Sequence, residues 1–338
     1  MSAVAHHGRS GVLFGGLLVF TAIAWLWALA AFHDQPGLLG LAMLAYAFGL
    51  RHAVDADHIA AIDNVTRKLM QGGQRPIAVG LYFSLGHATV VLLASCALAG
   101  AAGATRVYLE RFRDAIGTVG ATVSVALLLL VALMNASILR TAVKARRRLR
   151  RADDAPPLPD SAFGSGAGLL ARACQPLFAL VTRSWHVCLI GFLFGLGFDT
   201  ATEIGVLGLS AAQAAKGLPL GSILVFPVLF AAGMSLLDTL DSTLMVGAYG
   251  WAAVEPLRKA SYNIVMLVIS ITVALVVGGA QAIGLLADRL HPGGAPGSAL
   301  LGLNQRFGTA GYLIIGVFLG CWLVSVALYR TRRPSPAS

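Results

Sequence analysis

Long apolar segments dominate this sequence of 338 residues. The first runs from Gly11 to Phe32 without a charged residue, and about 20 apolar residues are enough for a helix to span a bilayer. Only 12% of the residues are charged, whereas soluble domains carry about a quarter. The sequence therefore predicts an all-α integral membrane protein and argues against a soluble enzyme, a disordered chain or a secreted disulfide scaffold. We expect eight transmembrane helices, at residues 11–32, 37–61, 77–103, 115–139, 187–211, 221–248, 261–287 and 308–329.

Lysine and arginine are unevenly divided between the two sides of these predicted helices. With a cytoplasmic N-terminus, 18 of the 25 basic residues lie in segments on the inner side, 6 lie on the outer side, and Arg51 lies within a helix. Basic segments are retained on the cytoplasmic side of a membrane. We therefore expect a single polytopic domain over residues 1–338 in the cytoplasmic (inner) membrane, with both termini in the cytoplasm.

The longest predicted connection, residues 140–186, contains the basic run from Lys144 to Arg151, followed by a stretch rich in Pro, Gly and Ser. We interpret it as a cytoplasmic basic loop and linker that sets the topology, because it adjoins a membrane helix. A patch for anionic lipid or nucleic acid is the alternative interpretation. The net charge of +10 thus reflects mostly topology, and we expect the lipid bilayer, not nucleic acid, as the macromolecular partner.

Acidic residues within the predicted helices are the main functional signal. Seven of the 15 acids lie there, against one basic residue: Asp55, Asp57, Asp63, Asp199, Glu203, Asp238 and Asp241. A carboxylate at the bilayer centre costs at least about 2.5–3.5 kcal/mol, so protonation or a bound cation must offset it. His52, His58 and His87 share these helices. Imidazole with carboxylate suits a transition-metal dication better than Na⁺ or Ca²⁺, which prefer oxygen ligands.

The second predicted helix carries four of these groups within seven residues. At about 100° per residue, His52, Asp55 and His58 form one stripe, and Asp57 lies off it. Either the backbone deviates after Gly49, or Asp57 acts outside the ligand set or as a separate proton site. We expect Arg51 to pair with Asp55 four residues later, in a structural role.

The fifth and sixth predicted helices each place two acids on one face. Asp199 and Glu203 are four residues apart, and Asp238 and Asp241 are three apart. Like charges on one face repel unless a cation or proton lies between them. For His87 alone, a hydrogen bond between helices is the alternative reading. The candidate metal ligands are His52, Asp55, Asp57, His58, His87, Asp199, Thr200, Glu203, Asp238 and Asp241.

A weak internal repeat relates the two halves of the chain. The segment beginning Phe48-Gly-Leu matches the one beginning Phe194-Gly-Leu, and the segment beginning at Phe83 matches the one beginning at Phe230. The second and third predicted helices thus match the fifth and sixth, offset by three spans and therefore running in opposite directions. This pattern predicts an inverted repeat with the substrate site near mid-membrane.

Four motifs resemble those of the nickel/cobalt transporter family (NiCoT). They are the His-x4-Asp-His pattern within residues 51–59 and the segments 83–91, 196–203 and 233–241, in the family's order. The resemblance implies secondary uptake of Ni²⁺ or Co²⁺ across the cytoplasmic membrane without ATP. It places the family's essential residues of the second helix at His52, Asp57 and His58, with Asp55 inside the same motif, and puts His87 in the place of the family's histidine in the third helix. Nickel or cobalt is then the transported substrate and not a cofactor, and no ATPase subunit is implied.

Two rival functions remain at this stage. An intramembrane metalloenzyme would also use a His/Asp cluster, but the chain has no His-Glu-x-x-His motif and its acids are spread over several helices, as a transport path requires. A metal-ion exporter of similar architecture is the second rival. For a transporter, we expect metal binding to weaken as the pH falls through about 6.5, because only neutral imidazole ligates.

Overall fold

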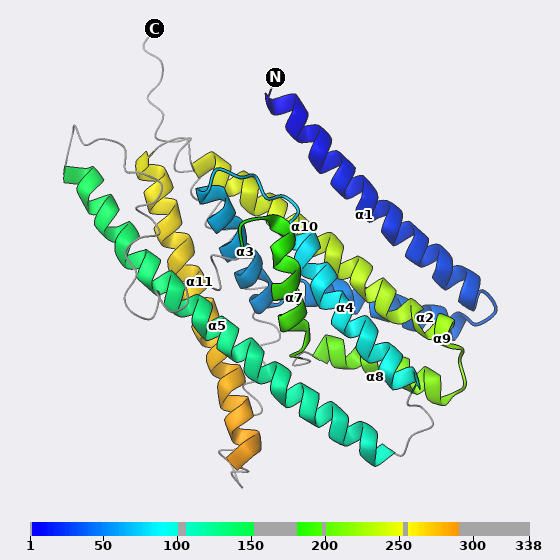
Figure 1. The fold of residues 1–338 in the computed structure, drawn as a ribbon. Helices are drawn as coiled ribbons and strands as arrows, with labels where there is room; N and C mark the ends of the chain where they lie inside the picture. The colour runs from blue at the N-terminus through cyan, green and yellow to red at the C-terminus, as the bar shows by residue number, and fades with distance from the viewer. Residues whose placement is uncertain (1, 101–105, 152–180, 198–200, 253–255, 291–338) are drawn as a thin grey trace.

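The fold is known from a computed structural model that describes residues 2–100, 106–151, 181–197, 201–252 and 256–290. Within these residues the chain is almost entirely helical and has no strand (Figure 1). The predicted all-α class is thus confirmed for the described part. The elements are α1 (Ser2–Phe32), α2 (Pro36–His52), α3 (Ala56–Gln71), α4 (Val79–Gly100), α5 (Arg106–Arg151), η2 (Ser184–His186), α7 (Val187–Gly195), α8 (Ala201–Ala215), α9 (Leu220–Ile223), α10 (Val225–Ala252) and α11 (Pro256–Leu290).

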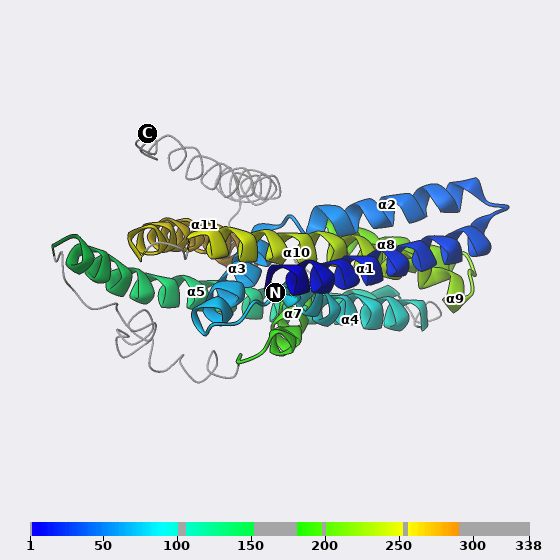
Figure 2. The same ribbon diagram turned by 90° about the horizontal axis from the view of Figure 1, so that it is seen from above.

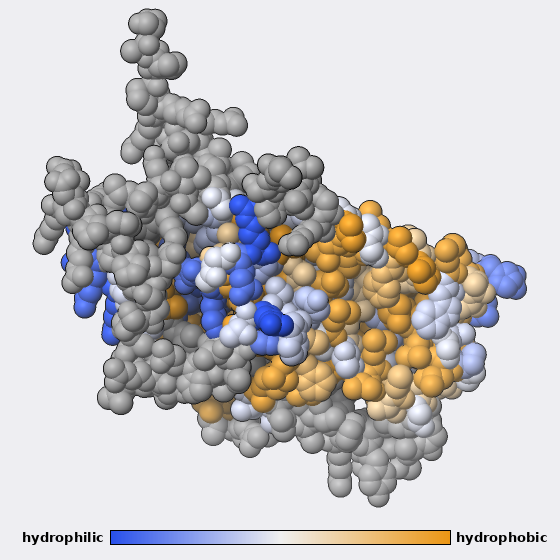
Figure 3. Space-filling view, turned by 45° about the horizontal axis from the view of Figure 1, so that its top comes forward, coloured by the Kyte–Doolittle hydropathy of each residue, from blue (hydrophilic) through white to orange (hydrophobic). Residues whose placement is uncertain are grey.

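Several described helices are long and apolar enough to cross a membrane. Four qualify alone, and α2 with α3 forms a fifth candidate, a pair bent by 51°. Most match predicted spans, and the predicted helix 308–329 lies outside the described residues. Some of their apolar residues form the core, and many others are exposed, among them Leu18, Val19, Ile23, Leu26 and Trp27 on α1. Figure 3 shows a broad apolar surface, with hydrophilic residues on its left side and a smaller group of them at the right tip.

Two predicted helices differ from the structure because their backbones are interrupted. The span predicted at 37–61 is divided between α2 and α3, which are separated by residues 53–55. The span predicted at 187–211 is divided between α7, which ends at Gly195, and α8, which begins at Ala201. Apolar periodicity alone cannot reveal such breaks, because both halves of each segment remain apolar or buried.

The basic run after the fourth predicted span is helical. The span was expected to end near residue 139, but α5 continues through Arg151 and includes Lys144. Lys and Arg are good helix formers, so a charged run after an apolar helix extends it readily outside the membrane. The first part of the segment predicted as a loop at 140–186 is therefore helix, and residues 152–180 lie outside the description.

The helices pack as groups around α10. This helix contacts α1, α2, α3 and α4, while α4 packs along α7 and α5 packs along α11 (Figures 1 and 2). Glycines allow the closest approaches, as in many membrane bundles. A Cβ atom on Gly49 would lie 2.0 Å from the carbonyl oxygen of Phe230, and one on Gly80 would lie 1.9 Å from that of Asp238. These contacts bring α2 and α4 against α10 on either side of one buried region.

Candidate metal site

The break between α2 and α3 brings two histidines together. His52 is the last residue of α2, and His58 lies in the first turn of α3. Between them, Asp55 has an extended backbone (φ −70°, ψ 147°), so the helix stops and restarts in a new direction. This answers the geometric question that the sequence posed: the backbone does deviate, at residues 53–55. As a result, the ring centroids of His52 and His58 lie 4.5 Å apart.

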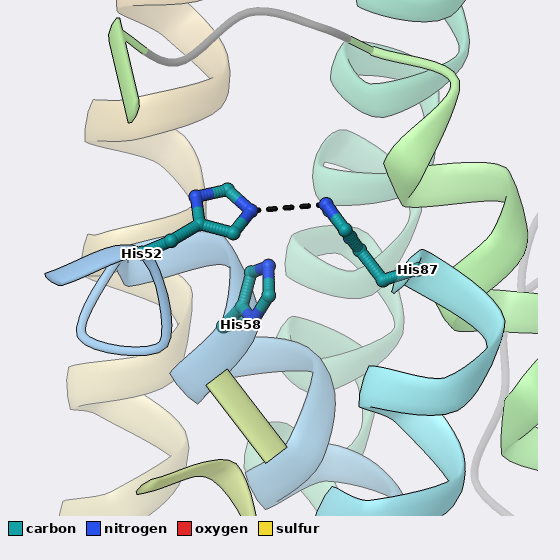
Figure 4. A group of neighbouring side chains, drawn as sticks. All are labelled: His52, His58 and His87. Carbon is teal, nitrogen blue, oxygen red and sulfur yellow. Dashed lines mark hydrogen bonds between the residues drawn. The ribbon is translucent and has the colours of Figure 1, made fainter. Parts of the chain in front are cut away.

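The third histidine approaches from α4. The ring of His87 lies 4.7 Å from that of His52 and 4.8 Å from that of His58, measured between centroids. Each of the three residues offers a ligand atom within 4.8 Å of the other two. Figure 4 shows His87 facing His52 across the site, with His58 beside them. We call His52, His58 and His87 the histidine cluster.

A carboxylate from the second half of the chain joins this cluster. The Nε2 atoms of His52 and His87 lie 2.9 Å apart. The Oε1 atom of Glu203, on α8, lies 2.6 Å from Nε2 of His87 and 3.8 Å from Nε2 of His52. Nitrogen and oxygen atoms from three helices therefore converge on one point, as the ligands of a metal ion do.

Two of the histidines are also held through their second ring nitrogen. Nδ1 of His52 lies 3.1 Å from an oxygen of Asp55 and 3.2 Å from the hydroxyl of Thr202. Nδ1 of His58 lies 3.2 and 3.3 Å from the two oxygens of Asp238. The Nε2 atom of His58 has no hydrogen-bond partner within the described residues. Carboxylates at one nitrogen, with the other directed inward, are typical of histidines that bind metal.

The site is buried among apolar side chains. None of the three histidine side chains exceeds 2% exposure. The ring of Phe83 lies 4.8 Å from that of His58, and the ring of Phe230 lies 5.3 Å from that of His52. Apolar walls exclude water, so polar groups inside must be satisfied by one another or by a bound ion.

The predicted site residues thus fall into separate positions. His52, His58, His87 and Glu203 meet at the centre. Asp55 and Asp238 lie behind histidines, and Asp55 also pairs with Arg51 as expected. One oxygen of Asp57 accepts the backbone N–H of His58, and an oxygen of Asp241 is buried without a hydrogen-bond partner among the described residues. The remaining two, Asp199 and Thr200, lie outside the described residues.

One polar contact was not predicted from the sequence. Ser84 donates a hydrogen bond of 2.6 Å to Asp238, whose carboxylate contacts His58. Ser84 lies three residues before His87, one helical turn away on α4, and this spacing was the signal in the sequence that could have identified it. A serine in an apolar helix usually bonds only to its own backbone, which is why the residue did not stand out.

Comparison with known proteins identifies the family of this chain. A family model described as high-affinity nickel-transport protein matches residues 38–328. The high-affinity nickel transport protein of Cupriavidus necator is 51% identical over 95% of this chain and 92% of its own length. The hydrogenase nickel incorporation protein HupN of Bradyrhizobium diazoefficiens is 49% identical over 97% of this chain and 86% of its own.

A further relative is named for another metal. The cobalt transport protein NhlF of Rhodococcus rhodochrous is 38% identical over 85% of this chain and 81% of its own length. No solved structure matches the chain. The match to the family model and the identities over most of each chain confirm the resemblance drawn from the four motifs. This multi-pass membrane protein therefore belongs to the family of high-affinity nickel-transport proteins.

Proposed function

We propose that this protein is a secondary transporter that takes up Ni²⁺, and also Co²⁺, through the histidine cluster. The observation that carries the proposal is the meeting of three buried histidines from three helices, with ligand atoms within 4.8 Å of one another. The relatives support nickel as substrate by their names, and NhlF supports cobalt. The family model and most of the relatives are named for transport, HupN is named for nickel incorporation, and none is named for a catalytic activity, so the metalloenzyme alternative is not favoured.

The proposed site divides the ten candidate residues by role. The three histidines and Glu203 bind the dication, and Asp55 and Asp238 orient His52 and His58 from behind. Asp57 and Asp241 lie beside the site as further carboxylates, for the metal or for protons. Asp199 and Thr200 belong to the proposed ligand set on grounds of sequence alone.

We further propose eight transmembrane helices with an inverted repeat that relates α2–α4 to α7–α10. In both halves the first matched segment has a helix end at or near its Phe-Gly-Leu sequence: α2 ends at His52, two residues after it, and α7 ends at Gly195, within it. The matched glycines Gly86 and Gly233 make equivalent contacts: a Cβ atom there would lie 1.9 Å from the carbonyl oxygen of Cys188 on α7 and 2.7 Å from that of Tyr46 on α2. Each continuous helix thus packs against the broken helix of the other half, as in repeat-built transporters.

The proposed location is the cytoplasmic (inner) membrane, with both termini in the cytoplasm. The distribution of Lys and Arg supports this orientation. In this arrangement, residues 1–338 form one polytopic domain, and residues 140–186 form a cytoplasmic connection whose first part continues α5. An inside-negative potential then drives a dication inward, which favours uptake over export.

The test is uptake of labelled Ni²⁺ into liposomes that contain the full chain. His52→Ala and His58→Ala each remove an imidazole from the cluster, and we expect each to reduce initial uptake at low nickel concentration by at least about tenfold, by analogy with lost metal ligands and their partners. His33→Ala is the matched control, because the side chain of His33 is 70% exposed and lies outside the cluster. Co²⁺ is tested as competitor. Normal uptake by both cluster variants would remove the proposed site.

A further inference from the structure

A second set of buried polar side chains lies along α3, beyond the histidine cluster. We call it the inner network. It joins α3 to α5, α10 and α11, and no member is more than 9% exposed. Its members are Asp63, Asn64, Arg67, Asn135, Tyr249 and Ser270.

The inner network lies in one direction from the cluster. His58 on α3 contacts Asp238 on α10. Asp63, five residues after His58, contacts Tyr249, which is eleven residues after Asp238. Asp63 thus lies about 7.5 Å from His58 along the axis of α3, since an α-helix rises about 1.5 Å per residue. In the proposed orientation, this is the direction of the cytoplasm and of metal release.

Asp63 is only partly satisfied in this conformation. The hydroxyl of Tyr249 donates a hydrogen bond of 2.6 Å to its Oδ1 atom. Its Oδ2 atom has no hydrogen bond within the described residues, and the nearest nitrogen of Arg67 is 3.9 Å away. An arrangement built only for stability would pair a buried carboxylate fully, because an unmade bond to a charged group is costly.

Arg67 is held back from Asp63 by amide side chains. Its guanidinium donates to Asn64 on its own helix and to Asn135 on α5, at 2.9 Å for the latter. Both amides also contact the hydroxyl of Ser270 on α11, at 3.1 and 3.0 Å. The positive charge therefore sits near Asp63 without a direct bond to it, and neutralises it only in part.

Tyr249 also belongs to a buried apolar group that adjoins the histidine cluster at Ile59. Its ring packs edge-on against Tyr262 with centroids 5.4 Å apart. Both rings belong to this buried apolar group with Ile59, which follows His58, and with Met245 and Met266. A dication leaving the cluster along α3 would meet this apolar group first. Among the described contacts, the hydrogen bond to Asp63 is the only polar contact between Tyr249 and α3.

We propose that Tyr249 and Asp63 form the inner gate of the transporter. In the closed state described here, the Tyr249 hydroxyl bonds Asp63, and Arg67 supplies the charge that keeps this carboxylate buried. Opening breaks the bond, moves the Tyr249 ring out of the apolar group, and leaves Asp63 facing the released dication. The assignment of the gate to metal release rests on the proposed function, whereas the existence of the gate itself does not.

The test measures how often the gate opens, without using nickel. Ala248 lies in the same apolar group beside Tyr249 and is 8% exposed, so Ala248→Cys places a buried thiol next to the proposed gate. In the full chain in lipid nanodiscs, mass spectrometry of the peptide that contains residue 248 gives its alkylation rate. A buried thiol reacts in proportion to the population of the open state.

Tyr249→Phe removes only the hydroxyl and keeps the ring. We expect it to raise the alkylation rate about tenfold, since it removes a hydrogen bond to a charged group. The matched control is Tyr46→Phe, which removes the same group from α2. Equal alkylation rates in the wild-type, Tyr249→Phe and Tyr46→Phe backgrounds would overturn the gate.

A second variant keeps the inference testable if the first is unstable. Asp63→Asn retains the acceptor oxygen but makes the bond neutral, so we expect a smaller rise, of about threefold. Because both variants weaken one bond, the effects of the double variant should not multiply. If the rise in alkylation rate of the double variant equalled the product of the two single rises, a gate formed by this bond would be contradicted.

Equilibrium dialysis with Ni²⁺ separates this inference from the proposed function. The hydroxyl of Tyr249 contacts none of the three histidines, so Tyr249→Phe should bind Ni²⁺ as the wild type does. Absence of binding in the wild type would reject the proposed function and leave the alkylation result standing. Normal binding with unchanged alkylation would reject the gate alone.

Discussion

Two histidines of the cluster use one ring nitrogen for an oxygen contact, and this decides what the other nitrogen does. With Nδ1 of His52 beside Asp55 and Nδ1 of His58 beside Asp238, the proton of each neutral imidazole is favoured at Nδ1. The lone pair of Nε2 is then available for a metal ion. The carboxylates also make each imidazole a better donor to the metal. At the scale of residues, we therefore expect the acids behind the histidines to affect metal binding as well as the histidines themselves.

This view gives a prediction for Asp238. Asp238→Asn replaces the charged partner of His58 by an amide of the same shape, and we expect the affinity for Ni²⁺ to fall about 10- to 100-fold, the usual cost of losing such a partner. Ser84→Ala leaves the carboxylate in place and removes only its hydrogen bond, so its effect should be smaller. Isothermal titration with Ni²⁺ measures both.

The control for these variants is Asp34→Asn, whose side chain is 82% exposed. If Asp238→Asn bound Ni²⁺ with wild-type affinity, orientation of His58 by Asp238 would be wrong.

At the scale of elements, the broken helices and the close helix contacts create the site together. The histidines come from two helices, because the backbone breaks after His52 and α3 starts in a new direction. In one straight helix His52 and His58 would share a stripe and Asp57 would lie off it. Close packing of α2 on α10 then fixes the depth of this break within the bundle, because Gly49 lies against the backbone at Phe230. A side chain at Gly49 would push the two helices apart.

We therefore expect alanine substitutions at two glycines of α2 to change the stability of the fold differently. Gly49→Ala would place a Cβ atom 2.0 Å from the carbonyl oxygen of Phe230, whereas Gly40→Ala meets nothing within 4 Å. We expect Gly49→Ala to destabilise the fold by about 1–3 kcal/mol or more, as overpacking does. Gly40→Ala should be neutral or slightly stabilising, by up to about 1 kcal/mol, because alanine favours helix.

Thermal unfolding of the two variants in detergent measures this difference. A melting temperature of Gly49→Ala equal to that of Gly40→Ala would show that α2 and α10 do not pack as closely as described.

At the scale of the whole molecule, the site joins the two halves of the chain. His52, His58 and His87 come from the first half, while Glu203 and Asp238 come from the second. We expect a dication bound among them to draw the halves together and its departure to let them separate. This placement suits a transporter whose halves move against each other around a central site.

The charge of the substrate gives a prediction at this scale. Moving a dication inward through 100 mV, inside negative, is favourable by about 4.6 kcal/mol, or about three orders of magnitude in the equilibrium distribution. In proteoliposomes, an imposed inside-negative potential should therefore raise Ni²⁺ accumulation strongly, and a reversed potential should suppress it. Uptake that is indifferent to the sign of the potential would indicate electroneutral exchange.

Several features were predictable because they depend on local chemistry. Charged and ionisable residues inside apolar segments are costly wherever they lie, so His52, His58 and His87 stood out as metal-site candidates without any knowledge of packing. The pair Arg51 and Asp55 followed from helical spacing and is present. The helix break at residues 53–55 could not be located, because Ala-Val-Asp contains neither glycine nor proline.

The amino-acid sequence by itself thus determined that the protein is a helical membrane protein, its family, and which side chains are suited to a dication. Only the tertiary structure decided which of these groups meet. His58 and Asp238 are 180 residues apart, and Tyr249 and Asp63 are 186 apart. The physical reason is that the hydrophobicity of a segment can be read from its own residues. Whether a carboxylate is a proposed ligand, an orienting group or part of a gate depends instead on its distance from side chains of other helices.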